Sequence, residues 1–178
     1  MIVSSTSGFS SATPSFTRDF RASVSLIALL WGLGCTQPSF AQSLPTGGTV
    51  ASGNVSISST SPTSLTISQS SRTGIVNWSS FSVGQGNQIQ FNNGSGATLN
   101  RVTGNVPSSI NGVLSATGSV YLVNPSGVVV GPSGEIKTGG SFVASTLDVK
   151  DAEFRAGGSL TFSGNSNASV VNLGKIGS

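Results

Sequence analysis

The sequence predicts an all-β protein of the β-solenoid class, and its composition is the first evidence. Only 7% of the 178 residues are charged, against roughly 25% in an average soluble protein. Glycine, serine, threonine, asparagine and valine are abundant instead, which is typical of strands joined by many turns. Hydrophobic residues make up 36%, so the chain lacks the low hydrophobicity and high net charge that mark disordered segments.

The first forty residues carry the pattern of an export signal. Arg18 and Arg21 precede the apolar run VSLIALLWGLGC (residues 24–35), and PSFA (residues 38–41) follows it. This pattern predicts a signal peptide of residues 1–41 that is cleaved after Ala41. The apolar run is shorter than the about 20 residues of a membrane-spanning helix. Cys35 leaves lipoprotein processing as an alternative, although Gly32 stands where that signal prefers leucine.

The predicted mature part, residues 42–178, contains neither cysteine nor histidine. Exported proteins often carry disulfides, so their absence is informative. Loops closed by disulfides in the periplasm would obstruct a chain that must then cross a second membrane unfolded. The absence of cysteine is therefore compatible with export through two membranes.

Alternating strands begin the predicted mature part. VSIS (residues 55–58) and SLTIS (residues 64–68) place apolar residues at every second position, which is the period of a half-buried strand. Because the open end of a solenoid invites aggregation, we expect the strands between Val50 and Ser68 to form an N-terminal β cap. Trp78 and Phe81 are expected in the core or the cap. No segment shows a helical period over three turns.

Two sequence matches at one spacing predict a repeat. GSVYL (residues 118–122) resembles GSLTF (residues 158–162), and GEI (residues 134–136) resembles GKI (residues 174–176), with the same offset in both cases. Periods of roughly 20 to 50 residues are typical of solenoids, and an offset of about 40 residues would fit two coils of about 20 residues. The segment VVNLGKIGS ends partway through this repeat, so we expect residues 42–178 to be truncated from a longer exported protein.

The stretch LVNPSGVVVG (residues 122–131) predicts one corner of a coil. Asparagine, proline and glycine suit a bend between strands, because each allows or fixes a turn conformation. We expect the side chains on one side of the bend, Val120 and Leu122, to point into the core, and Tyr121 to face outward. Val128 and Val130 would begin the next face.

Together these segments resemble the two-partner-secretion (TPS) domain of filamentous-haemagglutinin-like exoproteins, especially the high-molecular-weight-adhesin branch. The resemblance covers nearly all of residues 44–178. It rests on five segments in the expected order: VNWSSFSVGQGNQIQF (76–91), LNRVTG (99–104), INGVLSATGSVYLVNPSGVVVG (110–131), GGSFVASTLDV (139–149) and VVNLGKI (170–176). It implies a right-handed parallel β-helix with an N-terminal β cap, at the head of a long adhesin-like protein that is secreted by, or displayed on, a Gram-negative bacterium.

The resemblance also implies a partner, an outer-membrane β-barrel transporter whose periplasmic POTRA domains recognise this region. The family signature NPNGI falls on NPSGV (residues 124–128) and departs from it at Ser126 and Val128, whereas the second signature, NPNL, has no counterpart. Further coils of the exoprotein could bind host or cell-surface receptors. The candidate transporter-recognition residues are Asn100, Arg101, Asn124, Pro125, Ser126 and Gly127.

Structural roles remain open for the same residues. NPSG could be a plain turn, and Asn100 with Arg101 could be an asparagine bonded to turn backbone beside a solvated arginine. A self-contained surface adhesin or a carbohydrate-binding β-helix is the alternative function.

Other classes are excluded by what the predicted mature part lacks. Its acids are Glu135 and three residues of DVKDAEF (residues 148–154), a segment expected to be a solvated loop. Without histidine or paired carboxylates, polysaccharide cleavage is disfavoured, and we expect no catalytic residue, cofactor or metal. The basic residues are scattered and the formal net charge is +3, so nucleic-acid binding is excluded. Threonines follow no regular register of the ice-binding kind.

Overall fold

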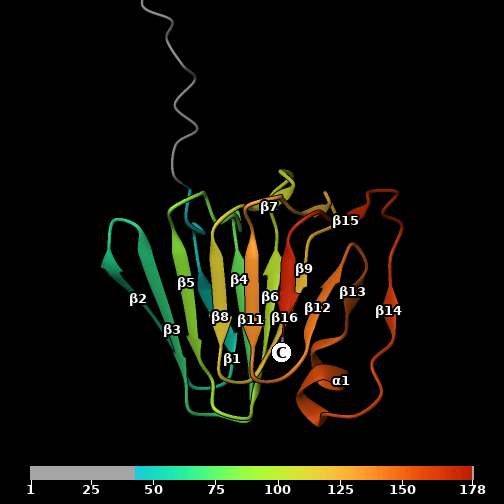
Figure 1. Ribbon diagram of the computed structural model, residues 1–178. Helices are drawn as coiled ribbons and strands as arrows, with labels where there is room; N and C mark the ends of the chain where they lie inside the picture. Colours follow the sequence, from blue (N-terminus) through green and yellow to red (C-terminus); the bar gives the residue numbers. More distant parts are fainter. Residues whose placement is uncertain (1–42, 178) are drawn as a thin grey trace, which may run out of the picture. The chain divides into compact units, whose positions relative to one another are not determined.

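The computed structural model describes residues 43–177, which belong to one compact unit, Ser39–Ser178. The predicted signal peptide, its cleavage point after Ala41 and Cys35 lie outside the described residues. Nearly all regular structure in the described part is β-strand, and the strands stack in successive coils (Figure 1). The predicted all-β class is confirmed.

Three sheets form the sides of the coils, and a fourth, two-stranded sheet lies outside them. Sheet I has the order β1 (Thr49–Ser52), β4 (Thr73–Trp78), β6 (Ala97–Val102), β9 (Ser119–Val123) and β12 (Phe142–Ser145). Sheet II has the order β2 (Val55–Ser61), β3 (Ser64–Gln69), β5 (Gln88–Asn92), β8 (Val113–Ala116), β11 (Glu135–Thr138) and β16 (Lys175–Gly177). Sheet III has the order β7 (Ser108–Ile110), β10 (Val128–Val130) and β15 (Val170–Asn172).

Parallel pairing between successive coils produces the β-helix. Ala97 of β6 pairs with Ser119 of β9, and Ser108 of β7 pairs with Val128 of β10, in each case one coil further along the chain. Within each strand, alternate side chains enter the interior, as the strand period requires. Val120 and Leu122 of β9 are fully buried, and so is Val128 of β10. The predicted inward positions are therefore confirmed.

One of the two sequence matches, GEI with GKI, is a structural repeat, but the two segments are separated by one coil and not by the two coils expected. Glu135 pairs in parallel register with Lys175, so GEI and GKI do stack. They are one coil apart, not two, because the last coil contains an excursion, which we define as residues 146–169, between β12 and β15. The excursion holds β13 (Asp148–Val149), helix α1 (Asp151–Ala156) and β14 (Phe162–Ser163).

The match between GSVYL and GSLTF is not a structural repeat, so this part of the prediction is wrong. The next coil places Phe142 of β12 beside Val120 of β9, where the repeat would have placed Leu160. Phe162 instead belongs to β14, which pairs antiparallel with β13 of the excursion. The similarity of the two segments is therefore confined to their sequences.

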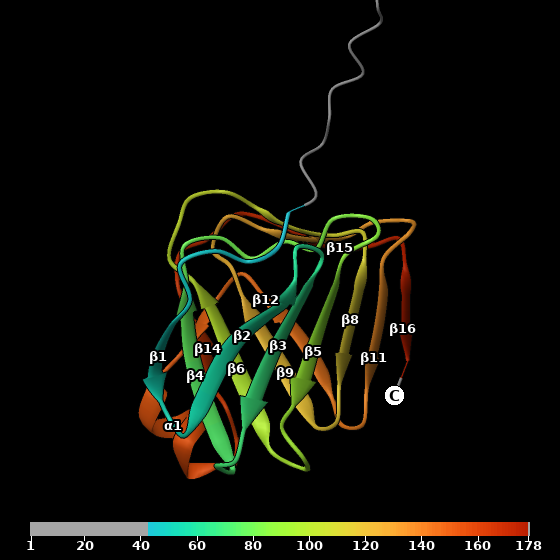
Figure 2. The same cartoon turned by 90° about the vertical axis from the view of Figure 1, so that its left-hand side faces the viewer.

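Antiparallel strands cap the N-terminal end of the solenoid, as predicted. β2 pairs antiparallel with β3, and β1 pairs antiparallel with β4, whereas the next strands along each sheet pair in parallel. Figure 2 shows β1 and β2 on the side that faces the viewer. Trp78 and Phe81 close the core beneath this end, each 1% exposed, with ring centroids 5.6 Å apart in an edge-to-face arrangement.

Glycines allow the coils to approach closely at one corner. Gly134 precedes β11 and stacks between Gly112, before β8, and Gly174, before β16. A Cβ atom at Gly134 would overlap the carbonyl oxygen of Ile110 in the neighbouring coil. This column of glycines explains why GEI and GKI share their first residue.

We expect Gly134→Ala to lower the free energy of unfolding by about 1–3 kcal/mol, because the added methyl must push two coils apart. Urea unfolding followed by circular dichroism measures the change. Gly158→Ala is the matched control, since a Cβ there meets no atom within 4 Å, and it should change stability by no more than about 0.5 kcal/mol. Equal stability of the two variants would contradict close coil contact at this corner.

Candidate recognition site

The outer face of sheet I is apolar, although it points away from the core of the solenoid. Ile75 of β4, Leu99 of β6 and Tyr121 of β9 stack in register across three coils. Val123 of β9 lies beside them, and Arg101 of β6 stands at the rim. Ile75 and Leu99 are 0% exposed and Val123 is 1% exposed. We call these five residues the outer face; an apolar surface of this kind requires a cover.

The excursion supplies that cover. Val149 and Phe154 are buried against the outer face, and Leu160 and Phe162 pack around them. The Phe154 ring meets the Tyr121 ring edge to face, with centroids 5.2 Å apart. Tyr121 therefore faces outward as predicted and is half-buried against Phe154 of α1.

The expectation that DVKDAEF is a solvated loop is wrong. The segment forms β13 and most of α1, and its two large apolar residues, Val149 and Phe154, are 2% and 3% exposed. The six-residue helix is too short to show the three-turn period that was sought in the sequence. Its formation follows from packing on the outer face, since helices this short are marginal alone.

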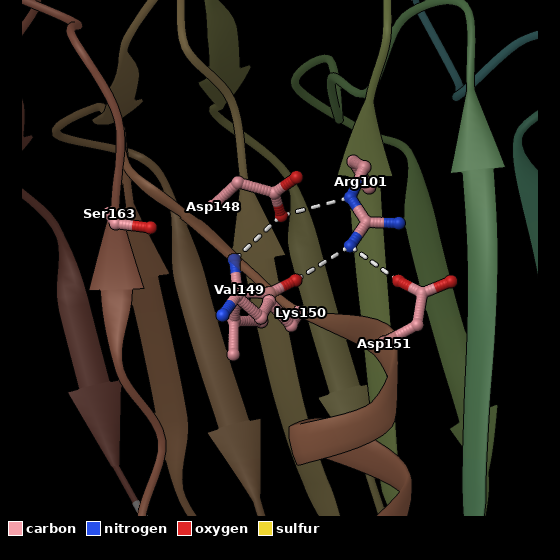
Figure 3. A pocket seen from close by; sticks show the side chains of 6 residues that line it. All are labelled: Arg101, Asp148, Val149, Lys150, Asp151 and Ser163. Atoms are coloured by element: carbon pink, nitrogen blue, oxygen red, sulfur yellow. Dashed lines mark hydrogen bonds and ion pairs between the residues drawn. The ribbon is translucent and has the colours of Figure 1, made fainter.

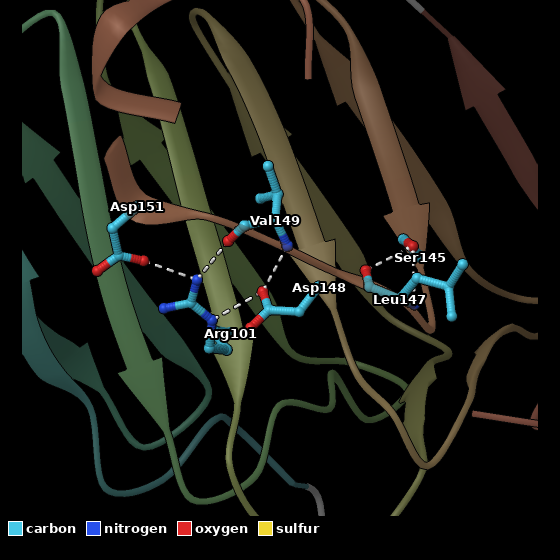
Figure 4. Close-up of polar contacts among 6 residues, drawn as sticks. All are labelled: Arg101, Ser145, Leu147, Asp148, Val149 and Asp151. Carbon is cyan, nitrogen blue, oxygen red and sulfur yellow. Dashed lines mark hydrogen bonds and ion pairs between the residues drawn. The ribbon is translucent and has the colours of Figure 1, made fainter. Parts of the chain in front are cut away.

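Arg101 fastens the start of the excursion to the outer face (Figures 3 and 4). Its Nε lies 2.9 Å from Asp148 Oδ1, and its Nη2 lies 2.8 Å from Asp151 Oδ1. The same Nη2 donates to the carbonyl oxygen of Val149 at 2.9 Å. The Arg101 side chain is only 17% exposed, so it is not the solvated arginine that the sequence left open.

The electrostatics of this cluster keep the guanidinium charged. Burial by itself would lower the pKa of Arg101, but hydrogen bonds to Asp151 and Asp148, together with their negative charges, outweigh it and raise the pKa. The turn just before Asp148 is held by the Ser145 hydroxyl, which accepts from Leu147 N–H at 2.9 Å and donates to its carbonyl at 2.8 Å (Figure 4). Asp148 Oδ1 also accepts from Val149 N–H at 2.8 Å. The cluster lines a shallow hollow of about 350 Å³ with Lys150 and Ser163 (Figure 3).

Asn100 lies within strand β6 and points into the core, so it is not bonded to a turn. Its Oδ1 accepts from Trp78 Nε1 at 3.0 Å, and its Nδ2 donates to the Tyr121 carbonyl at 3.3 Å. The side chain is 0% exposed. In the folded domain Asn100 therefore satisfies the buried indole and is out of reach of a partner.

The NPSG corner is built as a hydrogen-bonded turn. Asn124 Oδ1 accepts from Ser126 N–H and Asn124 O from Gly127 N–H, both at 2.9 Å. Gly127 has a φ of 114°, a conformation that suits glycine alone. Asn124 is 0% exposed, and its Nδ2 donates to the Val106 carbonyl and to Ser108 Oγ in the preceding coil. Pro125 is exposed and Ser126 is half-buried.

Both groups of candidate residues touch the excursion. Arg101 binds its start, and Ser166 Oγ, near its return, donates to the Pro125 carbonyl at 2.6 Å. Asn124 N–H donates to the carbonyl of Ser145, the β12 residue that immediately precedes the excursion. The cover that the excursion forms over these strands was not predicted from the sequence. One signal for it is present in Ile75-Val76 and in the run Val120–Val123, because unbroken apolar residues indicate a strand that is buried on both faces.

The described residues provide polar and apolar contacts, and few of their side chains could take part in catalysis or bind a metal. Within residues 43–177, no three histidine, cysteine, aspartate or glutamate side chains gather as metal ligands would. In the same part of the chain, no helix has the length and apolar character to cross a membrane. Two acids of the excursion, Asp148 and Asp151, are engaged by Arg101, and the third, Glu153, lies 3.9 Å from Lys150 Nζ. The fold and the candidate residues thus define a capped β-helix whose corners and outer strands offer surfaces for contact with other protein segments.

The family model of the TPS secretion domain matches residues 41–177, and the chain belongs to that family. It is the N-terminal secretion module of a two-partner-secretion exoprotein, a class exported across the outer membrane with a dedicated transporter. The resemblance seen in the sequence motifs is confirmed.

Related proteins agree with this assignment. The chain is 39% identical over 129 residues to a heme/hemopexin-binding protein of Haemophilus influenzae strain Rd, covering 71% of this chain and 14% of that protein. A second heme/hemopexin-binding protein of Haemophilus influenzae is 38% identical over 100 residues, covering 55% of this chain and 11% of that protein. The chain thus spans about a seventh or less of these relatives.

A solved structure has the same fold. The crystal structure of the HMW1 secretion domain from Haemophilus influenzae superposes with a TM-score of 0.66 at 31% identity. The match covers 74% of this chain and 36% of that chain. The parallel β-helix of the secretion domain is therefore confirmed by an independent fold comparison.

We expect Asn124→Ala to destabilise the domain by about 1–3 kcal/mol, because it leaves buried groups of the preceding coil without partners. Urea unfolding of the purified domain is the measurement. Ser126→Ala is the matched control within the same turn, because Ser126 contributes its backbone N–H to the bond with Asn124. If both substitutions cost the same, the asparagine side chain does not hold this corner.

Arg101→Gln should loosen the excursion more than the coils. We expect amide hydrogen exchange across residues 149–163 to accelerate by about tenfold, as one charged network of roughly 1–2 kcal/mol is lost. Exchange in β5, β8 and β11 should be unchanged. Lys137→Gln, which breaks an exposed pair with Glu135 elsewhere, is the control. Uniform acceleration through all strands would show that Arg101 stabilises the whole solenoid instead.

Proposed function

We propose that this domain is the part of a large exported protein that the periplasmic POTRA domains of its outer-membrane transporter recognise, and that it starts β-helix folding at the cell surface. The match of residues 41–177 to the secretion-domain family carries the proposal. Residues 1–41 would direct the chain into the periplasm and be removed there. The domain would act without catalysis, cofactor or metal.

Recognition by strand addition fits the chemistry of this chain. An extended segment can add to an exposed sheet edge of the transporter, where main-chain hydrogen bonds give affinity and alternate side chains give specificity. In the folded solenoid those main-chain groups are already paired between coils, as in β6 with β4 and β9. Strand addition therefore requires a chain that has not finished folding.

The candidate residues differ in how far the folded domain buries them. Asn100 and Asn124 are 0% exposed in the folded domain, so they could contact the transporter only before folding. Pro125 and Ser126 keep some exposure at their corner and could contact it in either state. Arg101 would become available when the excursion is undocked.

Folding outside the cell would oppose backward movement of the chain. Each finished coil offers paired edges and apolar side chains to the next, so folding can propagate along a solenoid. In the last described coil, β15 and β16 present Val170, Val171 and Ile176 with 37% to 46% of their surface exposed. These side chains are placed to receive a following coil, and further coils of the exoprotein would carry any binding to host or cell-surface receptors.

Deletion of residues 42–149 from the exoprotein, with the predicted signal peptide retained, should abolish secretion into the medium. We expect at least about a tenfold loss and accumulation in the periplasm, because the transporter would lack its recognition segment. Immunoblots of medium and periplasm measure both. Full-length protein carrying Lys137→Gln is the control for a surface change in the same region.

Undiminished secretion of the deleted protein would contradict the proposed function. Adhesion of the purified domain to host cells, with secretion independent of the transporter, would favour a self-contained adhesin.

A further inference from the structure

We propose that a small pocket between sheet I and the excursion binds one acidic sugar unit, such as a uronic acid, with the sugar carboxylate on Arg72. The pocket exists only in the folded domain, so binding is a property of the exported protein and not of the chain that the transporter recognises. This inference goes beyond the proposed function in secretion. It adds a ligand site within the domain to the receptor binding expected of further coils.

The pocket lies where strands β4 and β6 begin, at the end of sheet I that the glycine loop after α1 covers. Thr73 of β4 and Ala97 of β6 are neighbours in register there, and α1 lies beside β4 (Figure 2). Gly157 and Gly158 follow the helix and complete the wall. The cavity holds about 190 Å³, which is less than the roughly 300 Å³ of the smallest sites for drug-sized molecules. This volume suits a single ring.

Arg72 supplies the positive charge of the pocket. Within residues 43–177, every salt bridge joins other residues, so no carboxylate of the described chain pairs with Arg72. Its main-chain carbonyl is fixed, because it accepts from Ala97 N–H at 2.9 Å. Its guanidinium lies against the glycine loop, since a Cβ at Gly157 would lie 3.3 Å from Arg72 Nη2. A guanidinium in this position can bind a carboxylate through two parallel hydrogen bonds.

Three hydroxyl side chains line the same pocket, those of Thr73, Ser95 and Tyr121. In Thr73 and Tyr121 the group that the fold uses is the main-chain carbonyl, which accepts from Ser71 Oγ at 2.8 Å and from Asn100 Nδ2 at 3.3 Å, respectively. Within the described part of the chain, the three hydroxyls themselves make no hydrogen bond. A hydroxyl can both donate and accept, so these groups match the hydroxyls of a sugar ring.

Apolar side chains form the base of the pocket, namely Ala97, Phe154 and Leu160. Phe154 is 3% exposed and is held by its edge-to-face contact with the Tyr121 ring. One face of a sugar ring carries C–H groups that can rest on such a base, while its hydroxyls and carboxylate meet the polar groups around it. An apolar base with a few convergent polar groups is the usual form of a small-molecule site.

The hydroxyls distinguish an acidic sugar from a simpler carboxylate. An aromatic acid would use Arg72 and the apolar base, but it would leave the hydroxyls of Thr73, Ser95 and Tyr121 without partners. A neutral sugar would use the hydroxyls and leave Arg72 without an anion. An acidic sugar uses both sets of groups, and we therefore assign this class of ligand to the pocket.

Titration of the purified domain, which forms one compact unit, with methyl β-D-glucuronide tests the proposal. Methyl β-D-glucoside is the control ligand, because it has the same ring and lacks the carboxylate. Proton–nitrogen correlation NMR should show saturable shifts of the Arg72 Nε–H signal and of the amides of Thr73, Gly96 and Gly157. The glucoside should bind at least about tenfold more weakly, because it cannot form the charge-assisted hydrogen bonds.

Two substitutions assign the contacts. Arg72→Gln should weaken binding of the glucuronide at least about tenfold and leave the weak binding of the glucoside unchanged. Tyr121→Phe keeps the ring against Phe154 and removes one hydroxyl, so it should weaken both ligands by about threefold. Arg155→Gln, at an exposed arginine of α1 that does not line the pocket, is the matched control and should bind like the unchanged domain. Urea unfolding checks that each variant is folded.

The proposal is overturned if the glucuronide gives no saturable shift at the pocket, or if the glucoside binds as tightly. Equal weakening by Arg72→Gln and Arg155→Gln would also overturn it, because binding would then follow net charge alone. Benzoate that binds as tightly as the glucuronide would contradict the sugar class, since benzoate offers a carboxylate and an apolar ring without hydroxyls. Secretion of the exoprotein with residues 42–149 deleted tests the proposed function separately and does not bear on this pocket.

Discussion

Parallel hydrogen bonding between successive coils is the constraint on which the structure depends. It sets the length of each coil, because Ser108 must arrive beside Val128 and Gln88 beside Val113. Alternate side chains then enter a narrow interior, and corners must bring backbones together, which is why Gly134 stands between coils. The buried Asn100 and Asn124 satisfy polar groups that this geometry encloses. A secretion domain with almost no charge is stable because backbone pairing and apolar stacking supply its order.

Arg101 connects this scaffold to its outer surface. From the rim of sheet I it reaches Asp148 and Asp151 and so ties a segment of the last coil to a strand of an earlier one. The apolar outer face beneath that segment would be costly to expose to water. The excursion follows these strands in the sequence and completes the fold by covering them.

The sequence predicted the scaffold well because strand alternation, turn residues and family motifs agreed with one another. The cap, the inward Val120 and Leu122 and the NPSG corner all followed from local chemistry. The excursion could not be predicted this way, because β13 and α1 are stabilised by contact with strands of much earlier coils, as where α1 packs on β4. For the same reason the burial of Arg101 could not be predicted, since its aspartate partners lie 47 and 50 residues away.

The excursion also shows how such a solenoid can diversify. It leaves at one corner and returns without disturbing the register of β10 with β15 or of β11 with β16. Closing a loop costs free energy that grows only with the logarithm of its length, about 0.6 kcal/mol for each doubling. Corners of the β-helix can therefore accept new segments at little thermodynamic expense, and exoproteins with a shared backbone architecture can acquire different surface decorations while their stacking stays intact.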